Sequence, residues 1–100
     1  MAFRINHAKV ISQANSIADD ASQISAQVKL LSQLEQDIRS AWKGEAATAF
    51  LSRLTMLKNN VKNTGQQMAK LASTIKYCAD RIQREDEEAN RRAAALKSIK

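Results

Sequence analysis

Hydrophobic residues recur at helical spacing along two long stretches of this chain, and no proline interrupts either of them. In the first stretch, one row repeats every seventh residue and comprises Val10, Ile17, Ile24, Leu31 and Ile38. A second row, four residues further on, comprises Ala14, Ala21, Val28 and Trp42, with Glu35 as its one polar position. Two such rows form a narrow apolar seam along one helix face. The pattern predicts a helix over about residues 7–41.

The second stretch carries a longer seam, in which the steps alternate between four and three residues. Its positions are Phe50, Leu54, Leu57, Val61, Thr64, Met68, Leu71, Ile75, Cys78 and Ile82. Beyond Ile82 the same register passes through Glu85, Ala89, Arg92 and Leu96, so the seam becomes mixed. This pattern predicts a helix over about residues 45–96. Gly65 is its weak point, since a glycine inside a helix costs roughly 1 kcal/mol relative to alanine.

Trp42, Lys43 and Gly44 lie between the two predicted helices. Gly44 can adopt the left-handed conformation that ends a helix, and Lys43 places a positive charge at the negative end of the first helix. Glu45 then falls in the first turn of the second helix, where negative charge is favourable. These residues predict a Trp-x-Gly bend at 42–44, with Trp42 covering the seam. The expected fold is all-α, an antiparallel two-helix hairpin forming one domain over residues 1–100.

Folding the chain at this bend brings the two seams into register. Four apolar layers result, which pair Val10 with Ile75, Ile17 with Met68, Ile24 with Val61, and Leu31 with Leu54. Ala21 then lies opposite Thr64 and Gly65, which makes a thin waist. We hypothesise that a partner helix approaches closely there, so that Gly65→Leu would disrupt association while the protomer stays helical. The alternative is that Gly65 is a tolerated surface glycine.

A two-helix hairpin covers only one side of each helix. Further apolar side chains flank the seam, namely Leu30, Leu34, Ala47 and Leu51. Two hairpins packed as a four-helix bundle would bury them. We therefore predict dimerisation, either with a second copy or with a similar hairpin protein.

The second helix is predicted to be much longer than the first, roughly 75 Å against 50 Å. Residues 81–100 should therefore extend past the start of the first helix as a projecting tail. This tail has no partner within the hairpin, so it is either frayed or kept for a separate recognition event.

The chain has a formal net charge of +6, and no acidic residue occurs from position 46 to position 79. The basic residues in that span are Arg53, Lys58, Lys62, Lys70 and Lys76. Such a flank can be simply solvated, or it can attract an acidic partner or an anionic lipid. Nucleic acid is not the expected partner, because aromatic residues are few and neither a helix-turn-helix spacing nor a tight arginine run is present.

No catalytic chemistry is indicated. His7 is the sole histidine, expected to be exposed in the first turn, and the acidic residues form no converging pair. Cys78 falls on the predicted seam, where a buried apolar role is expected, with an intermolecular disulfide as the alternative. We expect neither an enzyme nor a cofactor, metal or small-molecule substrate. The first residues lack the pattern of a cleavable signal peptide.

The length, the two heptad helices and the central Trp42-Lys43-Gly44 resemble the WXG family of about a hundred residues, the ESAT/Esx-like substrates of type VII secretion. The resemblance implies a dimerising helical hairpin that leaves Gram-positive or mycobacterial cells without a cleaved signal peptide. It also implies a membrane-bound ATPase as partner, and it allows a role as the export partner of another substrate such as a larger toxin.

The resemblance further implies an export signal beyond the core of the second helix. One form has an acid four residues after a tyrosine, but here Arg81 follows Tyr77 at that spacing and Asp80 comes one residue early. A second form is matched in three places by Ile82, Asp86 and Ala89, whereas Ala93 replaces its final histidine. The tail therefore holds a partial signal, with a solvated helix as the alternative.

Two other function classes share some of these features. A cytosolic coiled-coil adaptor would show the same heptads, and a basic nucleic-acid-binding protein would show the same net charge. Detection of the chain in culture supernatant would separate secretion from both. A gel shift at two salt concentrations would separate the adaptor from the nucleic-acid binder.

Overall fold

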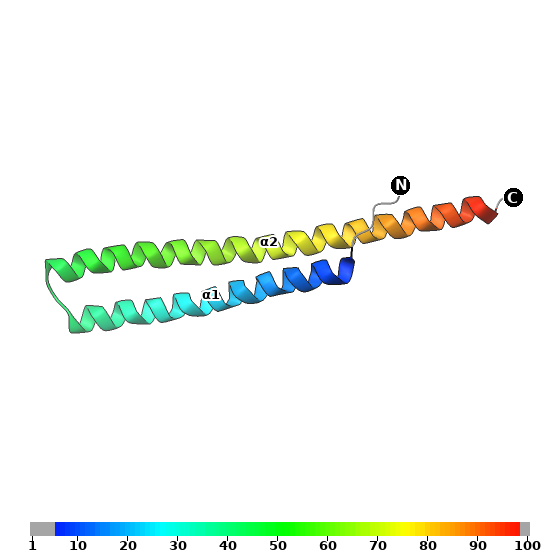
Figure 1. Ribbon diagram of the computed structural model, residues 1–100. Helices are drawn as coiled ribbons and strands as arrows, with labels where there is room; N and C mark the ends of the chain where they lie inside the picture. The colour runs from blue at the N-terminus through cyan, green and yellow to red at the C-terminus, as the bar shows by residue number, and fades with distance from the viewer. Residues whose placement is uncertain (1–5, 99–100) are drawn as a thin grey trace.

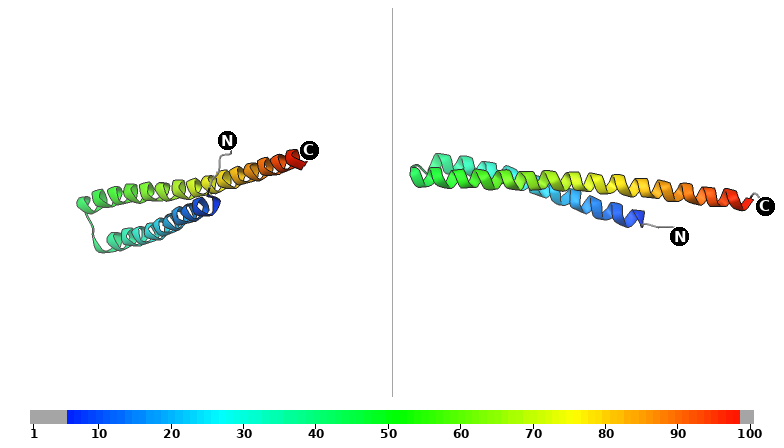
Figure 2. Two further views of the ribbon diagram at one scale, coloured as in Figure 1. Left: turned by 45° about the vertical axis from the view of Figure 1, so that its right-hand side comes forward. Right: turned by 90° about the horizontal axis from the view of Figure 1, so that it is seen from above.

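The computed structural model describes residues 6–98, and within them it contains two helices and no strand. α1 spans His7–Ala41 and α2 spans Glu45–Ser98. The two run antiparallel as a hairpin (Figure 1), which measures 86 × 16 × 14 Å. The helices cross along their length when viewed from above (Figure 2). The prediction of an all-α chain made of two long helices is confirmed.

Local hydrogen bonds define the helix ends. At the start of α1, the side chain of Asn6 accepts a bond of 3.1 Å from the backbone N–H of Lys9, which is N-capping. At its end, Trp42 takes an extended conformation while its N–H still bonds to Ile38. Gly44 has a φ of +114°, a conformation that side chains with a Cβ rarely adopt. Trp42, Lys43 and Gly44 thus connect the two helices.

Both predicted rows of α1 face α2. Ala14, Ala21 and Glu35 are buried, and the partly buried positions are Val10, Ile17, Ile24, Val28, Leu31 and Ile38. The largest of these side chains keep one edge in solvent, because a single neighbouring helix cannot surround them.

α2 meets α1 through one predicted row and one unpredicted row. The predicted row is Leu54, which is buried, with Val61, Met68 and Ile75, which are partly buried. The other inward row is Leu51, Lys58, Gly65, Ala72 and Ala79, whereas the buried Ala47, seven residues before Leu54, begins the first row. The placement of Phe50, Leu57 and Leu71 in the hairpin seam was wrong, since they are 46%, 53% and 52% exposed. Small side chains occupy the contact because the helices approach closely.

Gly65 shows how close that approach is. A Cβ built on Gly65 would lie 2.9 Å from Cγ2 of Ile24 and 3.8 Å from the carbonyl oxygen of Ala21. The alternative of a tolerated surface glycine was therefore wrong, because Gly65 is buried. Gly65→Leu would also push α1 and α2 apart, so it cannot serve as a variant that affects only a partner.

The far end of α2 continues beyond α1 (Figure 1). Nε2 of His7, at the start of α1, lies 2.6 Å from Oδ1 of Asp80. The 18 residues from Arg81 to Ser98 therefore extend past this contact by roughly 27 Å at the helical rise. Across the described residues, neither helix has a stretch long and apolar enough to cross a membrane.

Candidate functional site

The hairpin has two different flanks beside its seam. Ala18 and Ser25 of α1 line the same groove as Lys62 and Ala69 of α2, so these four residues lie on one flank. We call it the polar flank. Leu34 and Leu57 lie on the other side of the inward rows, because each immediately precedes an inward position, Glu35 or Lys58.

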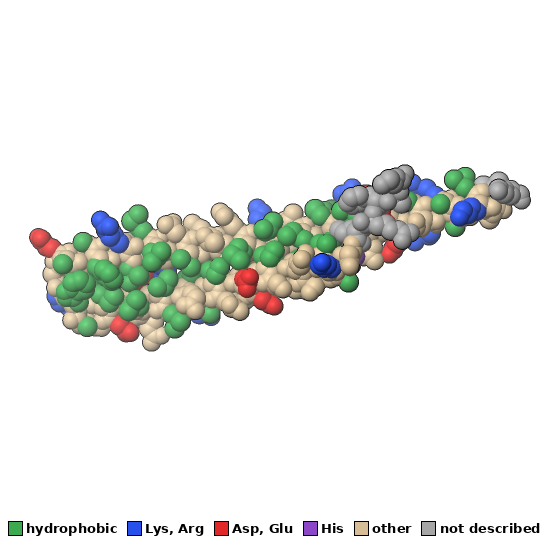
Figure 3. Space-filling view, viewed as in Figure 1, with side chains coloured by type: hydrophobic (Ala, Val, Ile, Leu, Met, Phe, Trp, Pro, Cys, Tyr) green, Lys and Arg blue, Asp and Glu red, His purple; other side chains and the backbone are tan. Residues whose placement is uncertain are grey.

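This second flank carries five of the exposed large apolar side chains of the hairpin. They are Leu30, Leu34, Phe50, Leu57 and Leu71, each between 43% and 58% exposed, and we call them the apolar stripe. Figure 3 shows hydrophobic side chains gathered over the connected end of the hairpin and continuing between the helices. An exposed surface of this kind commonly mediates contact with another protein.

Trp42 adds to the apolar surface at the connected end. Its ring lies 5.9 Å from that of Phe50 between centroids, at an interplanar angle of 52°, a tilted arrangement favourable for aromatic pairs. Trp42 was predicted to cover the seam, but 44% of it is exposed to solvent. Trp42 therefore contributes exposed apolar surface and does not fill the core of the hairpin.

A polar cluster lies inside the seam near this end. Nζ of Lys58 lies 2.7 Å from Oε1 of Glu35, the Thr55 hydroxyl donates to Oε2 at 3.3 Å, and Arg39 lies 3.8 Å from Oε2. The hydrogen bond and charge of Lys58 lower the pKa of Glu35, with smaller contributions from Thr55 and Arg39, against an upward effect of desolvation. The one polar position in the α1 seam is thus paired across the hairpin.

This pairing predicts a pH dependence. Because the pKa of Glu35 is lower in the folded state than the ordinary 4.5, its ionised form stabilises the fold above that pH. The contribution is lost as the pH falls through the lowered value. Urea unfolding between pH 7 and pH 3 should show this loss in the wild type and a weaker one in Glu35→Gln. Asp37→Asn, an exposed carboxyl two residues on, should keep the wild-type profile, and identical profiles for all three would contradict the role of Glu35.

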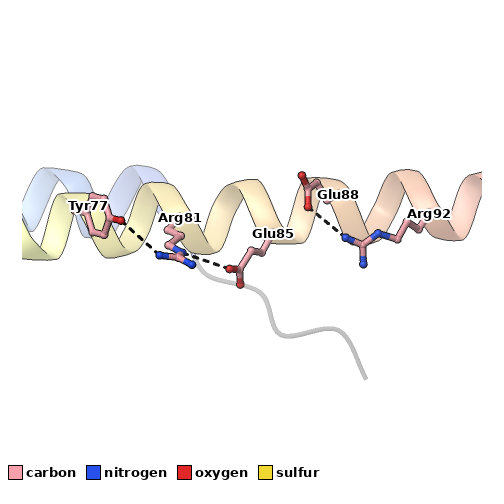
Figure 4. A network of polar contacts seen from close by, with 5 residues as sticks. All are labelled: Tyr77, Arg81, Glu85, Glu88 and Arg92. Atoms are coloured by element: carbon pink, nitrogen blue, oxygen red, sulfur yellow. Dashed lines mark hydrogen bonds and ion pairs between the residues drawn. The ribbon is translucent and has the colours of Figure 1, made fainter.

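Tyr77, a candidate for the export signal, is 60% exposed on α2. Nη1 of Arg81 donates to its hydroxyl at 3.5 Å, and Nε of Arg81 lies 3.6 Å from Glu85 (Figure 4). One turn further on, Arg92 pairs with Glu88 at 3.3 Å. Arginine therefore occupies the position beside Tyr77 at which the signal would place an acid.

The other candidate residues divide into two groups. Asp80 is held by His7, which secures it to the hairpin. Ile82 and Asp86 are partly exposed and Ala89 is exposed, all beyond that contact. Spacings of four and three residues bring these three to one face of the projecting helix, so the structure groups them and separates them from Asp80.

Two expectations about single residues were wrong. His7 is not simply exposed, since its side chain is partly covered and contacts Asp80. Cys78 is exposed rather than buried, because it lies in the row of Phe50, Leu57 and Leu71.

Comparison with known families identifies the chain. The WXG100 family model, described as proteins of 100 residues with WXG, matches residues 2–87, a span that includes Trp42-Lys43-Gly44. The chain belongs to the WXG100 family. No curated protein and no solved structure matches it. Membership of the WXG100 family points to a substrate of an ESAT/Esx-like type VII secretion system.

Sequence reasoning missed the inward role of Lys58 and Thr55 in this WXG100 protein. The signal was the polar position Glu35, since a buried carboxylate requires a cation or a hydrogen-bond donor opposite it. Lys58 precedes the seam residue Val61 by three positions, as an inward residue would.

Proposed function

We propose that this WXG100 protein is a dimeric substrate of a type VII secretion system, or the export partner of another substrate such as a larger toxin. It is then secreted or displayed at the cell surface. The family match carries this proposal, because it covers residues 2–87 and includes the Trp-x-Gly motif. The exposed apolar stripe supports the dimeric form.

Dimerisation would remove the apolar stripe from water. Its five side chains leave a large apolar area on a hairpin with a thin seam, and apolar burial is the main favourable term in protein association. Two hairpins joined by these stripes would form a four-helix bundle. The same stripe could bind a second copy of the chain or a similar hairpin protein.

The projecting part of α2 suits recognition by the secretion ATPase. Ile82, Asp86 and Ala89 share a face beyond the end of α1, so a partner could bind them without opening the hairpin. Tyr77 and Asp80 are less suited to this role, because Arg81 and His7 already engage them. We assign the export signal to the first group.

The proposal is tested by secretion from a cell that carries a type VII system. The chain should accumulate in the culture supernatant of the wild type and remain inside a strain that lacks the secretion ATPase. A cytosolic marker protein controls for lysis. Equal amounts in the two supernatants would contradict the proposal, as would retention inside both strains.

A double substitution tests the assigned signal. Ile82→Ser with Asp86→Asn should reduce secretion to the level of the strain without the ATPase, because it removes the apolar and the acidic contact together. Glu87→Gln with Arg91→Gln is the matched control, since both residues are exposed on the same segment. Both variants should have the same oligomeric state in solution as the wild type. Normal secretion of the first variant would exclude this signal.

A further inference from the structure

A groove of about 590 Å³ lies between the two helices on the polar flank, away from the apolar stripe. Residues 18–29 of α1 and residues 62–73 of α2 bound it. Each of these spans measures roughly 17 Å at the helical rise. The groove is therefore about as long as three turns of a helix.

The groove has an apolar floor and short walls. Ile24, Val28 and Gly65 contribute to the floor, in a region where the helices approach closely. The walls carry small side chains, namely Ala18, Ala21, Ser22, Ser25, Ala69 and Ser73. Apart from Lys29, Lys62 and Gln66, the side chains of the walls are small, so the backbone of a partner could come close to the floor.

The charged residues that line this groove are all basic. Lys29 and Lys62 line it from the two helices, and no acidic residue lines it. Within residues 6–98, neither ammonium group has a carboxylate at ion-pair distance. The exposed acids of α1 are Asp19, Asp20 and Asp37, and none of them lines the groove.

We propose that this groove binds an acidic amphipathic helix of a partner protein. The small apolar face of that helix would rest on Ile24 and Val28, and its carboxylates would pair with Lys29 and Lys62. The site would lie on the outside of a dimer formed through the apolar stripe. This inference rests on the proposed function, to which it adds the chemistry of the secreted partner.

The lining favours a peptide over a lipid chain. The lining residues include Ser22, Ser25, Gln66 and Ser73, whose hydroxyl and amide groups can hydrogen-bond to a peptide but not to an alkyl chain. A helix with glutamate or glutamine at its margins can satisfy them. Its cylindrical shape also fits a straight groove between two helices.

The test uses a defined probe. A capped 18-residue peptide has alanine and leucine on one face and glutamate along both margins, and a second peptide has glutamine in place of every glutamate. Fluorescence anisotropy with the full chain should show saturable binding of the glutamate peptide. The glutamine peptide should bind about ten-fold more weakly, as expected for the loss of a few partly exposed ion pairs.

Two matched double variants separate the groove from general charge. Lys29→Gln with Lys62→Gln should weaken peptide binding about ten-fold. Lys9→Gln with Lys70→Gln removes the same charge from exposed positions outside the groove, and it should change the affinity less than about two-fold. Ala69→Phe, which fills the groove without changing charge, should abolish binding.

Several results would overturn the proposal. They are equal loss in the two double variants, undiminished binding to Ala69→Phe, equal binding of the two peptides, or no binding of either. Vesicles of phosphatidylcholine and phosphatidylglycerol form a further arm, and groove-dependent binding to them without peptide binding would assign the site to lipid instead. Light scattering on the same samples gives the molecular mass of the protein. If the protein is a monomer and still binds the peptide, the proposed dimer is refuted and the proposed groove site is not.

Discussion

Leu57→Glu is expected to convert a dimer into a monomer of 11.1 kDa. Leu57 lies in the apolar stripe and is 53% exposed in the single hairpin, so the substitution leaves the hairpin itself intact. In a symmetric dimer it would bury two carboxylates against an apolar surface. At about 2 kcal/mol for each copy, the dimer would dissociate roughly a thousand-fold more readily.

Size-exclusion chromatography with light scattering measures this effect, and circular dichroism checks that the helices remain. Met56→Glu is the matched control, because Met56 is the preceding residue and is 63% exposed outside the stripe. The control should keep the mass of the wild type. If both variants keep that mass, the stripe is not the dimer interface. If the purified wild type is a monomer even at high concentration, the stripe binds a different hairpin protein and not a second copy of the chain.

Ala72→Leu is expected to destabilise the hairpin by about 1–3 kcal/mol, the usual cost of overfilling a packed contact. Ala72 is 2% exposed on the inward row of α2, in the part of the chain where Gly65 permits close approach. Three extra carbon atoms would force α1 and α2 apart. This would weaken the contacts of neighbouring layers as well.

Urea unfolding at a fixed protein concentration measures this loss, since any dimerisation would make the stability depend on concentration. Ala69→Leu provides the control, because Ala69 is exposed one turn earlier on the same helix. It should shift the urea midpoint little. A shift of the same size in both variants would mean that close packing at Ala72 does not limit stability.

The fold class could be predicted from the sequence because helix periodicity is a local property. The rows of α1 that begin at Val10 and Ala14 are separated by polar residues, so only one face could turn inward. The inward row of α2 through Leu54 and Val61 was predicted for the same reason.

The second inward row of α2 could not be predicted in this way. The row through Phe50 and Leu57 and the row one residue later, through Lys58 and Ala72, both border the row of Leu54. Hydrophobicity favours the first, yet close packing of two helices favours small side chains. The distance between two helices depends on how they pack, so it cannot be predicted from the periodicity of one helix.

The candidate export site was only partly predictable. Spacing alone grouped Ile82, Asp86 and Ala89, but it could not show that His7 holds Asp80 or that Arg81 contacts Tyr77. Those contacts depend on where α1 begins relative to α2. The groove on the polar flank was also hidden, because residues 18–29 and 62–73 meet only after the chain folds.

Among the described residues, no large side chain is completely buried. The stability of the hairpin therefore comes from many partly buried contacts along its length and not from one fully buried core. Opening of either end of the hairpin would therefore break only a few partly exposed contacts at a time.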